Sequence, residues 1–350
     1  MAYADNGDLL VADVGAARIR RLRASDGTVS TIAGSGVPGF SDGPALSSRM
    51  NYPSGLATWG GAVLFADAGN HRIRLLGADG AVSTLAGNGT GGFCGDGQPA
   101  TSACLFEPWG VAVDASAGGG VVYVADTLNS RVRAVSAGVI STFAVVAGCR
   151  PQALAVYAPR VGRRQLLAAS TACHVIHTID VATGAVSVLA GDGWRDAASG
   201  AGRYAGDGGP ATLASLRSPQ GVSVDAWDRV YVADAGSSII RVVTPWHSSR
   251  LGVDTIDLLA GVAGNASFSG DGCAGTAATL NGPSGVAVSP TSLDVAVADR
   301  YNFRVRLVGL AAAASLTPTG TVTPTQSQTP SFSGTRSVST TATGTMTSTL

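Results

Sequence analysis

Residues 66–76 read ADAGNHRIRLL, and related strings recur along the whole chain. The clear copies begin at Val11, Ala66, Ala125, Ala233 and Ala298, and a weaker copy, AASTACHVIHTI, begins at Ala168. Self-similarity at this spacing is typical of one continuous array of like units, not of separate domains. The repeat therefore has to be interpreted before any single motif.

Each unit contains the same four short segments. They are a P-x-G start, an apolar run ending in Ala-Asp, an R-x-R run, and a run resembling VSTLAG. Gly, Pro, Asn and Asp separate the segments, as expected for turns between β-strands. One such sheet is marginal alone, but sheets stacked around an axis bury each other's faces. We predict an all-β, six-bladed β-propeller of four-stranded antiparallel blades over residues 1–310.

Several strings resemble a known repeat family. PSGLA, FADAGNHRIR, VSTLAG and GFCGDGQPATSA are similar to the NHL repeat, whose members form six-bladed propellers. The resemblance covers roughly residues 2 to 308. The weak copy departs from it, because Ser170 replaces the Asp, Cys173 the Asn and His177 the second Arg. That blade is assigned by its place between clearer copies.

Both ends of the chain bear on how the ring closes. The chain begins inside a first strand, and the repeat region stops after the third strand of the last unit, at Val308. We predict an incomplete last blade, and we expect upstream residues to supply a closing strand, with a signal peptide as a further candidate.

From 311 to 350, twenty of the forty residues are Ser or Thr. Such a composition predicts a disordered Ser/Thr/Pro-rich tail, typical of an O-glycosylated stalk.

Charge and hydropathy exclude some partners. Positive and negative residues balance at 23 each, Lys is absent, and Glu107 is the single glutamate. Without a basic cluster, we predict no nucleic-acid partner. No stretch of about 18 apolar residues occurs, so we predict no membrane span. We expect a monomer.

Excess loop length gathers on one face of the predicted propeller. Antiparallel geometry puts the turn between the second and third strands on the same face as the loop that leads to the next blade. We call this end the long-loop face, because it carries Gly87 to Pro108, Gly191 to Pro219 and Gly261 to Pro283. Scaffolded loops usually carry binding, so we predict a protein or glycan partner there. The candidate contact residues are Asn70, His71, Asn129, Asp96, Asp207, Asp271 and Asn302.

The charged residues of the repeat admit two interpretations. The Asp-Gly turns at Asp42, Asp96, Asp207 and Asp271 offer oxygen ligands for calcium, but they lack the alternating acids and the bidentate Glu of an EF-hand loop. We predict no cofactor, with calcium as the alternative. Pairs such as Arg72 and Arg74 lie on one face of a strand. They either form a ligand-binding ring or pair with aspartates of their own or the neighbouring blade, and we favour the pairing.

The cysteines and the N-glycosylation motifs indicate the cellular compartment of the protein. Cys94 and Cys104 share one loop, and Cys149 and Cys173 share the long-loop face, so both pairs are disulfide candidates, with reduced buried pairs as the alternative. The sequence also contains N-glycosylation motifs at Asn88 and Asn265. With the tail, these features favour an extracellular or cell-surface protein over an intracellular one with a disordered linker.

Residues for catalysis are few. Apart from Glu107, the candidates are the four histidines, of which His71 and His174 take equivalent places in blades that are not neighbours. G-x-S-x-G and H-E-x-x-H motifs are absent. The sequence therefore predicts no catalytic residue and favours a non-enzymatic recognition or scaffold module. The alternative is a metal-dependent hydrolase or lyase, similar to lactonase or amidating-lyase propellers, that uses the central channel.

Overall fold

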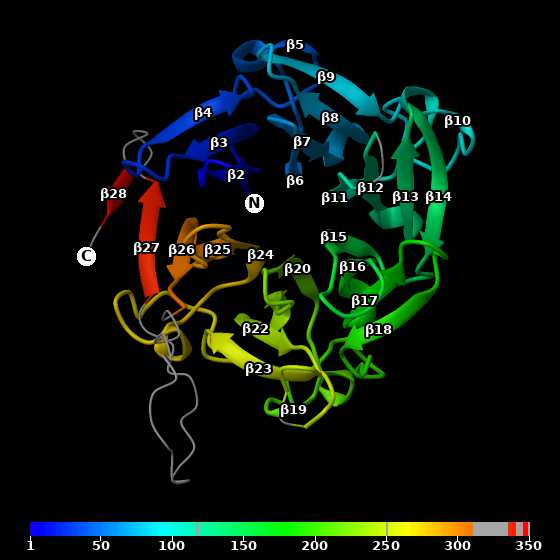
Figure 1. Cartoon of the computed structure of the whole chain (residues 1–350). Helices are drawn as coiled ribbons and strands as arrows, with labels where there is room; N and C mark the ends of the chain where they lie inside the picture. The colour runs from blue at the N-terminus through cyan, green and yellow to red at the C-terminus, as the bar shows by residue number, and fades with distance from the viewer. Residues whose placement is uncertain (117–118, 250, 311–334, 341–345, 349–350) are drawn as a thin grey trace, which may run out of the picture.

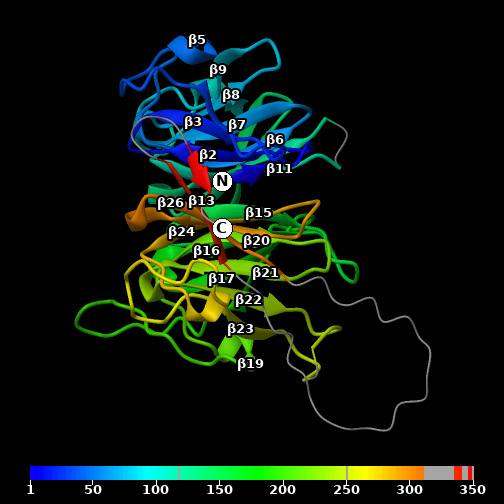
Figure 2. The ribbon, with the colours of Figure 1, turned by 90° about the vertical axis from the view of Figure 1, so that its left-hand side faces the viewer.

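Six antiparallel sheets stand around a central axis. A computed structural model describes residues 1–116, 119–249, 251–310, 335–340 and 346–348. The inner strand of each sheet lies near the axis and the outer strand at the rim (Figure 1). From the side, inner strands run along the axis and loops project from the two ends (Figure 2). The predicted six-bladed, all-β propeller is confirmed.

Each blade is a meander whose strands follow one another from the axis to the rim. The first three blades are β1 (Ala2–Tyr3), β2 (Leu9–Asp13), β3 (Arg18–Leu22), β4 (Val29–Ala33); β6 (Pro53–Trp59), β7 (Ala62–Asp67), β8 (Arg72–Leu76), β9 (Ala81–Ala86); and β11 (Pro108–Asp114), β12 (Val121–Asp126), β13 (Arg131–Ser136), β14 (Val139–Val145). The last three are β15 (Pro151–Tyr157), β16 (Gln165–Ser170), β17 (Val175–Asp180), β18 (Val186–Ala190); β20 (Pro219–Val224), β21 (Val230–Asp234), β22 (Ile239–Thr244), β23 (Thr255–Ala260); and β24 (Pro283–Val288), β25 (Val295–Asp299), β26 (Arg304–Val308), β27 (Thr335–Thr340).

Short elements lie in the connections between the strands and between the blades. Two-residue strands lie against outer strands: β5 (Gly43–Pro44), β10 (Gln98–Pro99) and β19 (Gly209–Pro210). The 3-10 helices are η1 (Ala45–Ser47), η2 (Ala68–Asn70), η3 (Ala100–Ser102), η4 (Thr127–Asn129), η5 (Thr171–Cys173), η6 (Ala211–Leu213), η7 (Ala235–Ser237), η8 (Gly275–Ala277) and η9 (Arg300–Asn302). Within the described residues, no helix has the length and hydropathy that a membrane crossing needs.

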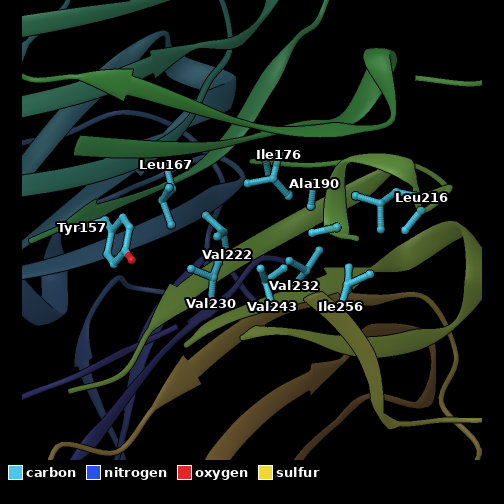
Figure 3. Close-up of a cluster of buried hydrophobic side chains, with 13 residues drawn as sticks. Tyr157, Leu167, Ile176, Ala190, Leu216, Val222, Val230, Val232, Val243 and Ile256 are labelled. Atoms are coloured by element: carbon cyan, nitrogen blue, oxygen red, sulfur yellow. The ribbon is translucent and has the colours of Figure 1, made fainter. Parts of the chain in front are cut away.

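The core lies between the blades. One buried cluster joins β16 and β17 of the fourth blade to β20, β21 and β22 of the fifth, and it includes Leu167, Ile176, Val232 and Val243 (Figure 3). Alternate residues of each strand face opposite neighbours, so both faces of a blade are apolar. The high apolar fraction of the chain is used in these contacts between blades.

The glycine of the P-x-G start allows inner strands to approach each other. A Cβ on Gly55 would lie 2.5 Å from the carbonyl oxygen of Trp109, and one on Gly110 would lie 2.6 Å from that of Gln152. Neither distance leaves room for a side chain, so glycine is needed where the ring narrows.

The last blade takes three strands, β24 to β26, from the repeat region, as predicted. Its outer position is occupied by β27, which pairs with β26 from Val308 opposite Thr335 to Arg304 opposite Ser339. A further strand, β28 (Met346–Ser348), pairs with β27. Two strands thus lie within the segment that the sequence predicts to be disordered. The rest of that prediction, over 311–334, 341–345 and 349–350, lies outside the described residues.

Candidate functional site

The long loops fold back onto the blade that follows them. Gly43 of β5 lies opposite Val82 of β9, and Gln98 of β10 lies opposite Ile140 of β14. The β19 strand extends the fifth blade in the same way. Each of these three loops thus adds a fifth strand at the rim, and it is held by backbone hydrogen bonds along part of its length.

A buried arginine joins each of four blades to the loop before it. Arg74 of the second blade is fully buried, and its guanidinium donates to Asp67 on the adjacent strand and to Asp42 in the loop, both at 2.6 Å. It also donates to the carbonyl oxygen of Ser41 at 2.7 Å. Because Asp67 belongs to the blade and Asp42 to the loop, one side chain connects the two.

The same arrangement recurs around the ring. Arg133 pairs with Asp126 at 3.3 Å and with Asp96 at 2.6 Å. Arg306 pairs with Asp271 at 2.8 Å and with Asp299 at 3.7 Å, and Arg241 pairs with Asp207. The predicted pairing of Arg with Asp is confirmed for the second arginine of these repeats. The predicted contact residues Asp96, Asp207 and Asp271 hold loops through these ion pairs.

An aromatic ring completes each clamp. The Phe40 ring centroid lies 3.9 Å from Cζ of Arg72 and 4.8 Å from Cζ of Arg74, an arrangement that favours cation–π attraction. Phe93 and Phe268 contact both arginines of later blades in the same manner, and Tyr204 contacts Arg241. Sequence reasoning missed this role, although an aromatic residue lies two or three positions before Asp42, Asp96, Asp207 and Asp271.

Asparagines of the repeat also hydrogen-bond to the loops. The Asn70 amide donates to the carbonyl oxygen of Gly39 at 2.8 Å and to the Asp67 carboxylate. The Asn129 amide donates to the Gly92 carbonyl oxygen, and the Asn302 amide to that of Ser267. These three predicted contact residues are therefore engaged within the protein, and a direct role in ligand binding stays a prediction.

Burial dominates the electrostatics of the clamps. Desolvation raises the pKa of Asp67, Asp126 and Asp299, against the opposing effect of hydrogen bonds and the nearby guanidinium groups. Asp234 differs, because its Oδ2 atom is buried without a hydrogen-bond partner. Burial raises the pKa of Asp234 to about 7.

The fourth blade replaces the clamp with a different arrangement. Ser170 and His177 stand where the other blades have Asp and the second Arg, and the Ser170 hydroxyl lies 2.8 Å from His177 Nδ1. Burial lowers the pKa of His177, which favours the neutral ring. The connection before this blade is short, and Cys173, at the asparagine position, forms a disulfide with Cys149 in it. A covalent bond thus takes the place of the asparagine contact.

Both predicted disulfides are confirmed. The second, between Cys94 and Cys104, links two sides of one long loop. At the matching place before the last blade, the hydroxyls of Ser269 and Thr279 lie 2.9 Å apart, within hydrogen-bond distance. Disulfides persist in oxidising compartments, so two of them fit a protein outside the cytosol.

Two histidines tie blades to the loops that follow them. His71 and His174 occupy equivalent left-handed positions, with φ of 55° and 59°. His71 Nδ1 accepts from the backbone N–H of Glu107 at 3.2 Å, and His174 Nδ1 from that of Ser218 at 2.9 Å. Each ring holds a separate blade junction, which is a structural use of the candidate contact residue His71.

Two aromatic side chains on this face are strongly exposed. Tyr52, directly before β6, is 58% exposed, and Phe303, after the 3-10 helix of the last blade, is 83% exposed. Both have left-handed backbones, with φ of 53° and 55°. Two aromatic rings in left-handed turns thus face solvent.

Apolar and polar side chains share the opposite end of the central channel. A cavity of about 420 Å³ is lined there by Leu56, Leu154, Val222 and Val286 of the inner strands, with Asp5 at its edge. Across the part of the chain that the structure describes, no three His, Cys, Asp or Glu side chains gather to hold a metal ion.

Known proteins resemble this chain in sequence and in fold. Residues 280–306 match the model of the NHL repeat. The NHL repeat-containing protein 2 of Bos taurus is 28% identical over 346 residues, covering 86% of this chain and 45% of that protein. The chain therefore spans less than half the length of this curated relative.

Two solved structures share the fold at low identity. An auxiliary nutrient binding protein from Bacteroides thetaiotaomicron superimposes with a TM-score of 0.60 at 14% identity, covering 87% of this chain and 66% of that one. A virginiamycin B lyase from Staphylococcus aureus gives 0.50 at 11% identity, covering 87% and 78%. At these identities the likeness shows the fold alone.

Proposed function

Because this chain is an NHL-repeat six-bladed β-propeller, we propose that it is a non-enzymatic recognition module whose long-loop face binds a protein or glycan partner outside the cell. The observation that carries this proposal is the clamp in four of the blades. Arg74 and its three counterparts hold the loops in one conformation before any partner arrives.

Preorganised loops favour binding, because the entropy of ordering them has been lost during folding and is not lost again on association. The exposed rings of Tyr52 and Phe303 add apolar area on the same face. Aromatic residues are enriched among those that dominate interface energies. A rigid frame that carries exposed rings is what recognition of a folded surface or a sugar requires.

The compartment and assembly state follow the same proposal. The two disulfides support a secreted or cell-surface protein, in which the sequons at Asn88 and Asn265 would carry glycans. Both asparagines are exposed. We propose a monomer that needs no bound cofactor, because the acidic loop residues already hold arginines instead of a cation.

A comparison of two faces tests the proposal. The full chain is immobilised, and binding is measured on a glycan array and by capture from the organism's secreted proteins. The test variant carries Tyr52→Ser and Phe303→Ser. The matched control carries Trp246→Ser and Leu251→Ser, whose side chains are 53% and 58% exposed on the opposite face.

The proposal expects at least a tenfold loss of binding in the test variant and wild-type binding in the control. Loss confined to the control would place recognition on the other face and contradict the proposal. Hydrolysis of a lactone panel, or bond cleavage by elimination in a lyase panel, dependent on a stoichiometric metal ion, would instead establish the enzymatic alternative.

A further inference from the structure

A second cavity opens at the end of the propeller opposite the long-loop face, and its lining includes Ala45 of the connection before β6. It has a volume of about 480 Å³ and opens between the first and second blades, at the end where β1 turns into β2 and β8 into β9. Its apolar lining includes Leu10, Ile32, Val63 and Leu76, and its polar lining includes Asp5, Asp8, Arg21 and Thr58. The apolar part continues the core between these two blades.

Arg21 breaks the pattern of the repeat. It pairs across the strands with Leu10, and the matching position of the second blade is Leu75, opposite Leu64. The later blades have Ala134, Thr178, Val242 and Leu307 at this position. A charged side chain thus replaces the uncharged one that packs between blades elsewhere.

The Arg21 side chain is 37% exposed, and its guanidinium is incompletely paired within the protein. Its Nε atom is buried and has no hydrogen-bond partner, which is costly in a folded protein. Asp8 Oδ2 lies 3.9 Å from that atom, beyond hydrogen-bond distance. The Asp8 carboxylate instead accepts from the backbone N–H of Ala24 and from the amide of Asn6.

We infer that this cavity binds a small zwitterion with an apolar side chain, of the α-amino acid class. The ligand carboxylate pairs with Arg21, its ammonium group with Asp5, and its side chain covers Leu10 and Leu76. The cavity carries two carboxylates and one guanidinium, so a simple anion meets net negative charge. A simple amine leaves the Arg21 donors without a partner. This site is independent of the partner proposed for the long-loop face.

Isothermal titration calorimetry on the full chain tests the inference. The probes are L-leucine, 4-methylpentanoate, which lacks the ammonium group, and 3-methylbutylamine, which lacks the carboxylate. We expect L-leucine to bind at least tenfold more tightly than either analogue. Equal affinities for the three probes, or no heat with any of them, would overturn the inference.

Two variants locate the site. Arg21→Leu restores the residue type of the second blade and is expected to fold with a melting temperature at or above that of the wild type, while L-leucine affinity falls at least tenfold. Asp5→Asn removes the exposed carboxylate and is expected to weaken L-leucine without changing 4-methylpentanoate. Arg163→Leu is the control, because this exposed arginine on the same face lies outside the cavity lining. Unchanged L-leucine binding in folded Arg21→Leu would refute the assignment.

Discussion

The clamp at Arg74 gives the sharpest test of what holds the long loops. Replacement by leucine removes the ion pairs to Asp67 and Asp42 and the hydrogen bonds to the carbonyl oxygens of Ser41 and Arg49. Asp67 stays fully buried and loses its counter-charge. Removing one partner of a buried ion pair costs about 3 to 5 kcal/mol. We expect Arg74→Leu to lower the free energy of unfolding by that amount in urea denaturation.

Two further variants show whether the loss of stability in Arg74→Leu comes from the unpaired charge of Asp67. Arg72→Leu removes the outer arginine of the pair, which is partly exposed, and is expected to cost about 1 kcal/mol. Adding Asp67→Asn to Arg74→Leu removes the unpaired charge but keeps an oxygen that accepts from the Asn51 N–H, so we expect the double variant to be more stable than Arg74→Leu alone. Equal losses for Arg72→Leu and Arg74→Leu would refute the reasoning.

Three further predictions concern other parts of the ring. Burial raises the pKa of Asp234 from 3.8 to about 7, so between these pH values the folded state binds a proton that the unfolded state releases. As pH rises through this window, the wild type should therefore lose on the order of 4 kcal/mol of stability relative to Asp234→Asn in urea titrations. A difference between the two proteins that does not change with pH would contradict this. Replacing Cys149 and Cys173 by Ala should cost about 2 to 4 kcal/mol by the same assay, and no change would show that the bridge adds nothing. Gly110→Ala should lower the free energy of unfolding by about 1 to 3 kcal/mol, because the added methyl group overpacks against the next inner strand. Gly15→Ala has open space around it and should leave the melting temperature unchanged.

Much of the scaffold could be predicted because its signals are local. The recurring Ala-Asp and R-x-R segments located the strands, including β16 of the weak copy, which ends at Ser170. The Arg–Asp pairing followed from residues that recur together in one unit. Period-two patterns place side chains on a face of a strand, so these features need no knowledge of the loops.

The missed features depend on how chain segments return to distant strands. The complete burial of Arg74 and the contact with Phe40 arise because a loop from before the blade folds over it. Arg21 looks like an ordinary member of an arginine run until the register places it opposite Leu10, in a space between blades. Composition alone likewise does not predict the pairing of β27 with β26.

Hydrogen exchange of the loop amides tests the central claim, that the long-loop face is built before a partner binds. The backbone N–H groups of Gly97 and Ala100 donate to Ile140 and Gly138 of the third blade, both at 2.8 Å. We expect their exchange to be slowed by on the order of a thousandfold relative to an unstructured peptide, and to quicken in Arg133→Leu. Wild-type exchange within about tenfold of the unstructured rate would contradict the claim.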